Sequence, residues 1–181
     1  MINLKVPRPD SQLPDENLQS LYALAMSTPP GDFLELGVYR GGSAWVLNEA
    51  AKIRGHRLHL FDTFTGIPEK TDIDVYGVGA FSDTTAQEVM AQIPDAVFHV
   101  GKFPDTLHDS LTDLAFVHVD CDQYDSCRLA IMLLWPRLLP GGVMAFDDYP
   151  FAGIKKAITD FAKGEPSFTQ AQVPYLRKGA G

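Results

Sequence analysis

Between residues 33 and 162, short apolar runs suited to buried strands alternate with longer amphipathic segments suited to helices. The predicted strands are 33–38, 57–61, 97–100, 114–119 and 143–146, and the predicted helices are 43–53, 85–93, 104–110, 126–138 and 154–162. Strands and helices in alternation form a mostly parallel sheet with helices on both faces, which binds ligands beyond the carboxyl ends of its strands. The sequence therefore predicts an α/β fold and directs the search for function to those strand ends.

The segments outside this alternation complete the predicted organisation. Residues 1–13 hold two prolines and no regular period, so we expect an N-terminal arm followed by a single domain over 14–181. A helix that covers the sheet is predicted over 15–26. Two short extended runs, 167–171 and 175–178, are compatible with a closing hairpin.

The charge balance restricts the partners of the chain. With 15 basic against 23 acidic residues, the net charge of -8 would repel a phosphate backbone, so we expect a small-molecule partner and no nucleic acid. Cys121 and Cys127 are too few for a disulfide framework, and no leader or long apolar span is seen. We therefore expect a cytoplasmic protein without a membrane anchor, and the sequence leaves open whether it forms a homo-oligomer.

A glycine turn joins the first predicted strand to the following helix. Gly37, Gly41 and Gly42 allow a tight turn and the close approach of a ligand to the backbone. Their spacing does not match the Gly-x-Gly-x-x-Gly fingerprint of dinucleotide sites. Glu35, at the end of the buried strand, would repel a pyrophosphate but suits a cofactor that carries an ammonium group. The turn therefore favours S-adenosylmethionine over NAD.

Asp62 ends the second predicted strand, 27 residues after Glu35 (62 − 35). An acidic side chain at about this position commonly binds ribose hydroxyls in such folds. Aspartate is also common as a turn or helix-capping residue. We favour ribose binding because the spacing and the position at the strand end agree.

Carboxylates also follow the fourth and fifth predicted strands. Asp120 ends one, and Asp147 and Asp148 end the other, so they should meet at the crevice. Oxygen ligands of this kind suit Mg²⁺, which could hold substrate hydroxyls and lower the pKa of the one that attacks. A solvated acidic rim is the alternative, and Asp125 or Ser126 is expected to cap the helix that follows.

The sequence leaves open the roles of two further features at these strand ends. His118 shares a face with Asp120 by strand alternation, and a structural histidine is as compatible with this position as a general base. The irregular stretch 63–83 follows a strand end, where lids and substrate loops occur. It is a candidate lid.

Four blocks resemble the macrocin O-methyltransferase (TylF/MycF) family: Phe-Leu-Glu-Leu-Gly-Val-Tyr-Arg-Gly-Gly-Ser at 33–43, Phe-Asp-Thr-Phe-Thr-Gly-Ile-Pro-Glu at 61–69, Asp-Cys-Asp-Gln-Tyr-Asp-Ser at 120–126, and Pro-Gly-Gly at 140–142 followed by Asp-Asp-Tyr at 147–149. The resemblance implies a Rossmann-like class I methyltransferase with a seven-stranded sheet of order 3-2-1-4-5-7-6. It also implies dependence on S-adenosylmethionine and Mg²⁺ and transfer of a methyl group to hydroxyls of deoxysugars. Cys121 and Gln123 depart from the family pattern, which commonly has Gly and Leu there.

The same resemblance implies roles for individual residues. The metal ligands would be Asp120, Asp147 and Asp148, and Asp120 would also be a candidate acceptor of the hydroxyl proton. With the glycine turn, it implies a cofactor site formed by Glu35, Gly37, Gly41, Ser43 and Asp62.

The expected acceptor is a hydroxyl of a sugar or of a glycosylated small molecule. The alternatives are a catechol-type enzyme acting on an aromatic diol and a catalytically inactive binding protein on the same fold. Phe64, Tyr76, Phe81 and Tyr149 could stack on a sugar or on an aromatic ring, so they do not decide between the two acceptors.

Overall fold

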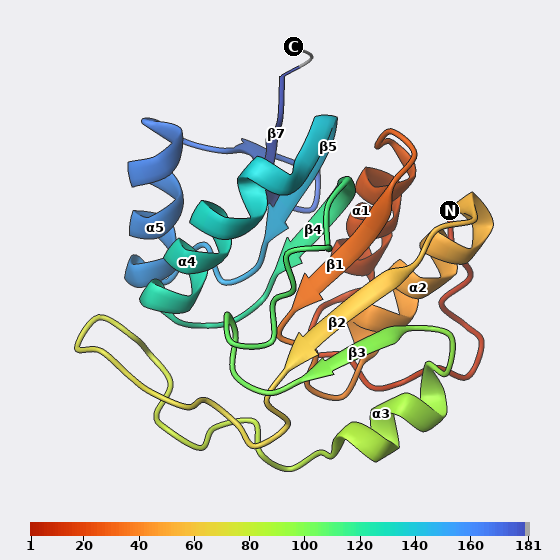
Figure 1. The fold of residues 1–181 in the computed structure, drawn as a ribbon, viewed down its shortest axis with the longest axis horizontal. Coiled ribbons are helices and arrows are strands. Elements are labelled where there is room, and N and C mark those ends of the chain that lie inside the picture. Colours follow the sequence, from red (N-terminus) through yellow and green to blue (C-terminus); the bar gives the residue numbers. More distant parts are fainter. Residues whose placement is uncertain (180–181) are drawn as a thin grey trace.

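The computed structural model describes residues 1–179 as a central sheet with helices on both faces (Figure 1). The last two residues of the predicted domain, 14–181, lie outside the described part. The elements are α1 (Asp15–Met26), β1 (Asp32–Leu36), α2 (Gly42–Arg54), β2 (Leu58–Asp62), α3 (Ala86–Gln92), β3 (Val97–Val100), β4 (Leu114–Val119), α4 (Tyr124–Leu134), a 3-10 turn (Trp135–Arg137), β5 (Leu138–Phe146), α5 (Ala152–Ala162), β6 (Ser167–Phe168) and β7 (Pro174–Arg177).

The sheet has seven strands in the order β3-β2-β1-β4-β5-β7-β6, which confirms the predicted order. The first five strands pair in parallel, and β7 pairs antiparallel with both β5 and β6. The closing hairpin is therefore present, with a shorter first strand than expected and the second strand displaced by one residue. The parallel strands place their carboxyl ends along one edge of the sheet (Figure 1), where the glycine turn and the acidic residues meet.

Each face of the sheet has its own apolar core. On one face, α1, α2 and α3 pack Leu21, Leu47 and Val89 around Phe33 and Leu60. On the other face, Ile131 of α4 and Ile158 of α5 pack on the strand residues that point to this side, among them Leu34, Phe61 and Val117. Because successive side chains in a strand point to opposite faces, continuous apolar runs are needed to bury a sheet on both sides.

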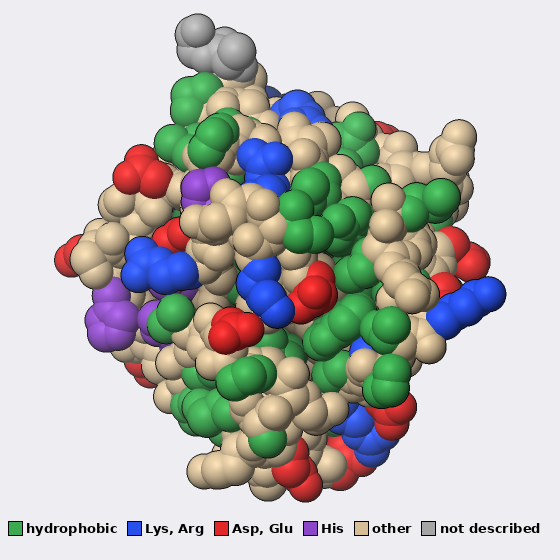
Figure 2. All heavy atoms as spheres, turned by 90° about the vertical axis from the view of Figure 1, so that its right-hand side faces the viewer, with side chains coloured by type: hydrophobic (Ala, Val, Ile, Leu, Met, Phe, Trp, Pro, Cys, Tyr) green, Lys and Arg blue, Asp and Glu red, His purple; other side chains and the backbone are tan. Residues whose placement is uncertain are grey.

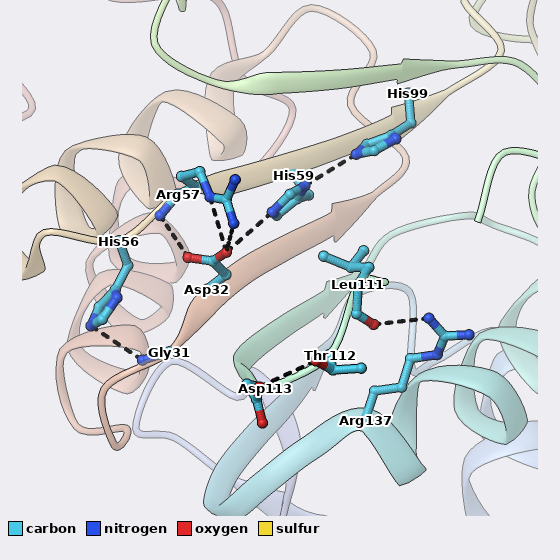
Figure 3. A network of polar contacts seen from close by, with 10 residues as sticks. All are labelled: Gly31, Asp32, His56, Arg57, His59, His99, Leu111, Thr112, Asp113 and Arg137. Carbon is cyan, nitrogen blue, oxygen red and sulfur yellow. Dashed lines mark hydrogen bonds and ion pairs between the residues drawn. The ribbon is translucent and has the colours of Figure 1, made fainter. Parts of the chain in front are cut away.

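The predicted helix over 104–110 is wrong. This segment forms two turns, in which the Leu107 N–H donates to the Pro104 carbonyl at 2.9 Å and the Leu111 N–H to the His108 carbonyl at 3.2 Å. Arg137 donates to the carbonyls of His108 and Leu111 at 2.7 and 2.8 Å, as Figure 3 shows for Leu111. The carbonyls of this segment therefore accept hydrogen bonds from the distant Arg137. In the predicted helix, they would have accepted them from N–H groups of the same segment.

Several other boundaries differ from the prediction by a few residues, and two of them have a clear physical reason. Helix α4 begins at Tyr124, and Gln123 occupies the capping position, so the expected cap at Asp125 or Ser126 is wrong. The Asp74 carboxylate, from a distant loop, accepts the Tyr124 N–H at 2.7 Å instead. Strand β5 begins at Leu138 rather than 143, because Leu138 pairs with Leu114 before an irregularity in the register.

Polar side chains link the three strands β1, β2 and β3 on one face (Figure 3). Asp32 accepts from Arg57 at 3.0 and 3.2 Å and lies 3.4 Å from His59 Nε2, while His59 Nδ1 lies 3.1 Å from His99 Nε2. His99 also stacks on Phe61, with ring centroids 4.2 Å apart. These contacts cover a part of the sheet face near residues 104–110. A helix was predicted there, and the structure has turns instead.

Figure 2 shows several exposed histidine side chains on the left of this face. The rings of His99 and His108 have centroids 5.8 Å apart. No helix among residues 1–179 is long and apolar enough to cross a membrane.

Candidate active site

The glycine turn is fixed by its close contact with the end of β4. Gly37 has φ of 88°, and a Cβ at this position would lie 1.6 Å from the backbone oxygen of Asp120. The Asp120 N–H in turn donates to the Leu36 carbonyl at 2.8 Å. Glycine is therefore required at this position both for its conformation and for its lack of a side chain. The turn is held in contact with the backbone of Asp120, one of the predicted metal ligands.

The Asp62 carboxylate holds the same turn from the neighbouring strand. Its Oδ2 accepts the N–H groups of Val38 and Tyr39 at 2.7 and 2.9 Å, and its Oδ1 accepts the Phe64 N–H at 2.8 Å. Asp62 also lines the cavity at this edge of the sheet. It thus has the turn-forming role that the sequence offered as an alternative, in a position that also faces a ligand.

Glu35 and His118 form a buried pair beneath the turn. The side chain of Glu35 is 0% exposed and that of His118 1% exposed, and Glu35 Oε1 lies 2.8 Å from His118 Nδ1. Within residues 1–179, Glu35 Oε2 has no hydrogen-bond partner, and Glu35 is not among the residues that line the cavity. The structure therefore places Glu35 behind the cavity wall, and His118 has a structural partner.

The first residues of α2 complete the turn. Gly41 has φ of 88° and precedes the helix, and Gly42 and Ser43 line the cavity. Gly41 faces away from the cavity, since a Cβ there would lie 2.9 Å from Val89 Cγ1 of α3. The structure thus brings Gly37, Ser43 and Asp62 to the cavity, while Gly41 shapes the turn from behind.

The predicted metal ligands converge at the ends of β4 and β5. One ligand oxygen each of Asp120, Asp147 and Asp148 lies within 4.8 Å of the other two, and all three residues line the cavity. Burial, reinforced by Asp147, raises the pKa of Asp120 well above its usual range. Burial and Asp148 raise the pKa of Asp147, while His118 lowers it. Like charges this close need a cation or protons between them, and this oxygen set fits a hard dication.

Asp122 is a fourth acid at this site, to which the sequence analysis assigned no role. It lines the cavity, has a left-handed backbone with φ of 60°, and forms a side-chain hydrogen bond with Asp148. Burial, followed by that hydrogen bond, raises its pKa to about 9. The signal in the sequence is its place two residues after Asp120, just beyond the end of the strand.

The loop over 63–83 covers part of the cavity. Tyr76 and Phe81 line it, with ring centroids 4.9 Å apart, and Phe81 also meets Tyr39 edge-on at 5.3 Å. The other two candidate aromatic residues lie elsewhere: Phe64 is buried in the core, and Tyr149 packs on Phe168. Two of the four aromatic residues are thus placed to contact a ligand.

The cavity is open to solvent on one side and connects the glycine turn with the acidic cluster. One side can therefore hold a nucleoside-like cofactor while the other holds a metal and a second substrate. The cavity also takes part of its wall from residues 10–13 of the arm, for which the sequence analysis predicted no site.

The sequence model of the macrocin O-methyltransferase (TylF) family matches residues 16–168. A tetracenomycin rhamnosyl 4'-O-methyltransferase of Streptomyces olivaceus is 31% identical over 73% of the chain and 58% of its own length. The mycinamicin III 3''-O-methyltransferase of Micromonospora griseorubida is 29% identical over 73% of the chain and 60% of its own length. The chain thus spans less than two thirds of the length of these relatives.

Solved structures of methyltransferases share the fold. The O-methyltransferase NovP has a TM-score of 0.75 at 23% identity, over 91% of this chain and 80% of that one. The calicheamicin methyltransferase CalS11 has a TM-score of 0.73 at 21% identity, over 93% of this chain and 87% of that one. These matches confirm the predicted class I methyltransferase fold.

Proposed function

We propose a function from one established premise, that this chain belongs to the macrocin O-methyltransferase (TylF) family. The chain is an O-methyltransferase that takes its methyl group from S-adenosylmethionine, uses Mg²⁺, and acts on a hydroxyl of a sugar or of a glycosylated small molecule. The single observation that carries this proposal is the convergence of Asp120, Asp147 and Asp148 in the same cavity as the glycine turn.

The cofactor would be held by Gly37, Ser43 and Asp62, with Gly41 and Glu35 supporting the turn from behind. The fit rests on two observations: a Cβ at Gly37 would fill the turn, and the Asp62 carboxylate lines the cavity beside that turn. Glu35, behind the cavity wall, would support the turn without contacting the cofactor. S-adenosylmethionine would supply an electrophilic methyl group at this end of the cavity.

The metal would be held by Asp120, Asp147 and Asp148. Bound Mg²⁺ would bind acceptor oxygens and lower the pKa of the attacking hydroxyl. Proton acceptance is then assigned to a carboxylate. Asp120 is the candidate from the sequence. Asp122 is a second one, because it faces the cavity beside Asp148 and is not one of the proposed ligands. To accept a proton it must be ionised, and a dication bound beside it would lower its pKa from the raised value of about 9.

A carbohydrate acceptor is favoured by one relative, the tetracenomycin 4'-O-methyltransferase of Streptomyces olivaceus, whose name describes a substrate that carries a rhamnosyl group. The rings of Tyr76 and Phe81 offer apolar faces to a sugar. The same rings would suit an aromatic diol, so a catechol-type acceptor is the second candidate.

The decisive experiment measures transfer of a labelled methyl group from S-adenosylmethionine to a panel of sugars, glycosides and catechols. Transfer to glycosides that requires Mg²⁺ and stops with chelator would support the proposal. Transfer only to catechols would shift the assignment to the second candidate. Binding of the cofactor without transfer to any acceptor, with metal present, would favour an inactive binding protein.

A further inference from the structure

We infer that residues 10–13 of the N-terminal arm form part of the cofactor site and bind the amino-acid end of S-adenosylmethionine. This inference rests on the proposed function and adds to it a segment that precedes the family match, which begins at residue 16. It assigns a binding role to a part of the chain that composition and periodicity describe only as irregular.

The arm is held against the domain by specific contacts. The Gln19 side chain of α1 donates to the Ile2 carbonyl at 2.7 Å and accepts the Ile2 N–H at 3.3 Å. Arg8 pairs with Asp15 at 2.8 Å, and Pro9 is buried. Residues 10–13 therefore lie between two anchored points, Pro9 and the start of α1, in a fixed path across the molecule.

That path crosses the beginning of α2. A Cβ at Gly42, the first residue of the helix, would lie 2.4 Å from Ser11 Cβ and 2.6 Å from the Asp10 carbonyl oxygen. Figure 1 shows the red N-terminal segment running beside α2. Gly42 has no left-handed backbone angle that would require glycine, so its lack of a side chain is explained by the arm lying directly on it.

The arm also faces the cavity with polar groups. Asp10, Ser11, Gln12 and Leu13 all contribute to its wall. Ser11 Oγ accepts the Leu13 N–H at 3.1 Å, and within residues 1–179 the Ser11 hydroxyl donates no hydrogen bond. The Gln12 amide lies beside the Tyr39 hydroxyl, at the glycine turn. The Ser11 hydroxyl and the Gln12 N–H that is not bonded to Tyr39 are thus available to a ligand at this place.

The position of the arm selects the amino-acid end of the cofactor. Asp62 marks the ribose site, and the acidic cluster marks the end where the methyl group is transferred. The arm lies over the start of α2, where the helix dipole favours an anion such as the cofactor carboxylate. Ser11 and Gln12 can add donors to the same carboxylate from the opposite side.

Calorimetric titration of the full chain with two probes tests this assignment. S-adenosylhomocysteine carries the amino-acid end, and 5'-methylthioadenosine lacks it but keeps the adenosine. In the double variant Ser11→Ala/Gln12→Ala we expect affinity for S-adenosylhomocysteine to fall about tenfold, from the loss of hydrogen bonds to a charged group. Affinity for 5'-methylthioadenosine should stay at the wild-type value.

Two controls separate the inference from its premise. Ser110→Ala, in an exposed turn that does not line the cavity, should leave both affinities unchanged. Asp62→Ala should weaken both probes. If the arm variant weakens both probes equally, or neither, the arm does not bind the amino-acid end and the inference is overturned. If the wild-type chain binds neither probe, the proposed function itself fails.

Discussion

The Asp120 carbonyl oxygen occupies the space that a side chain at Gly37 would need, with only 1.6 Å to the position of the missing Cβ. The cofactor turn and the metal-ligand strand end are therefore in direct backbone contact. Gly37→Ala should force them apart and also strain a backbone with φ of 88°. We expect the free energy of unfolding to fall by about 3 kcal/mol or more, and S-adenosylhomocysteine binding to be lost.

Urea unfolding and calorimetry would check this prediction. Gly55→Ala is a matched control, because Gly55 also has a left-handed backbone, with φ of 71°, but has open space around it. It should cost about 1 kcal/mol from the backbone alone and leave binding intact. Equal losses in the two variants would show that the contact with Asp120 contributes nothing.

The Asp62 carboxylate accepts three backbone N–H groups around the turn. Asp62→Asn replaces one acceptor oxygen by an amide that cannot accept, so part of this set is lost. We expect the free energy of unfolding to fall by about 2 kcal/mol and affinity for S-adenosylhomocysteine to fall at least tenfold. Unchanged affinity alongside a stability loss would assign Asp62 to the turn alone.

The parts of the site that the sequence predicted share one physical basis. Parallel strands bring their carboxyl ends to one edge, so acidic residues that follow separate strands must converge, as Asp62, Asp120 and Asp147 do. The order of the strands, by contrast, was predicted only from the family resemblance.

Other features depend on contacts between distant segments. Glu35 follows the strand pattern, but only the structure shows that its Oε1 pairs with His118, 83 residues away, behind the cavity wall. The predicted helix over 104–110 gave way to turns whose carbonyls Arg137 binds. The arm lines the cavity because it packs directly on Gly42, and this contact leaves no periodic pattern in the sequence. Pattern analysis has no access to such tertiary partners.

The acidic cluster predicts a division of roles between ligands and proton acceptor. Asp147→Ala removes a proposed ligand, so Mn²⁺ binding, followed by electron paramagnetic resonance, should weaken at least tenfold and methyl transfer should stop. Asp122→Asn should keep Mn²⁺ binding within about twofold of the wild type and lower the rate of methyl transfer by about a hundredfold or more.

The comparison with Asp120 completes this test. Asp120→Asn should lose both metal binding and transfer if Asp120 is a ligand. Full activity of Asp122→Asn would leave Asp120 as the remaining candidate for the proton acceptor. Full activity of all variants in excess chelator would remove the metal from the proposed function.

The histidines at the β2–β3 edge predict a loss of stability in acid. Burial lowers the pKa of His59, and burial, with the charges of His59 and His108, lowers the pKa of His99 to about 4. The unfolded chain therefore binds more protons than the folded one below pH ~6.5. The stability that these histidines contribute is present above that pH and is lost as the pH falls toward 4. Urea unfolding between pH 7 and 4.5 should show a smaller decline in His99→Gln than in the wild type, and parallel curves would contradict this assignment.

The last prediction concerns how the loop over 63–83 is held. The Asp74 carboxylate accepts the N–H of Tyr124 at 2.7 Å and both the N–H and hydroxyl of Thr71, at 2.8 and 2.7 Å. It thus ties the loop to the start of α4 and holds Tyr76 over the cavity. Asp74→Ala removes these bonds and leaves the loop free to open, at a cost of about 1–2 kcal/mol for the lost helix cap. We expect trypsin to cut after the exposed Lys70 several times faster in this variant, and KM for the acceptor to rise more than kcat falls.

Asp72→Ala, an exposed neighbour in the same loop, is the matched control and should change neither measurement. Equal cleavage rates in the two variants would show that the loop is held by its aromatic contacts instead, because Tyr76 and Phe81 would then keep it closed without Asp74.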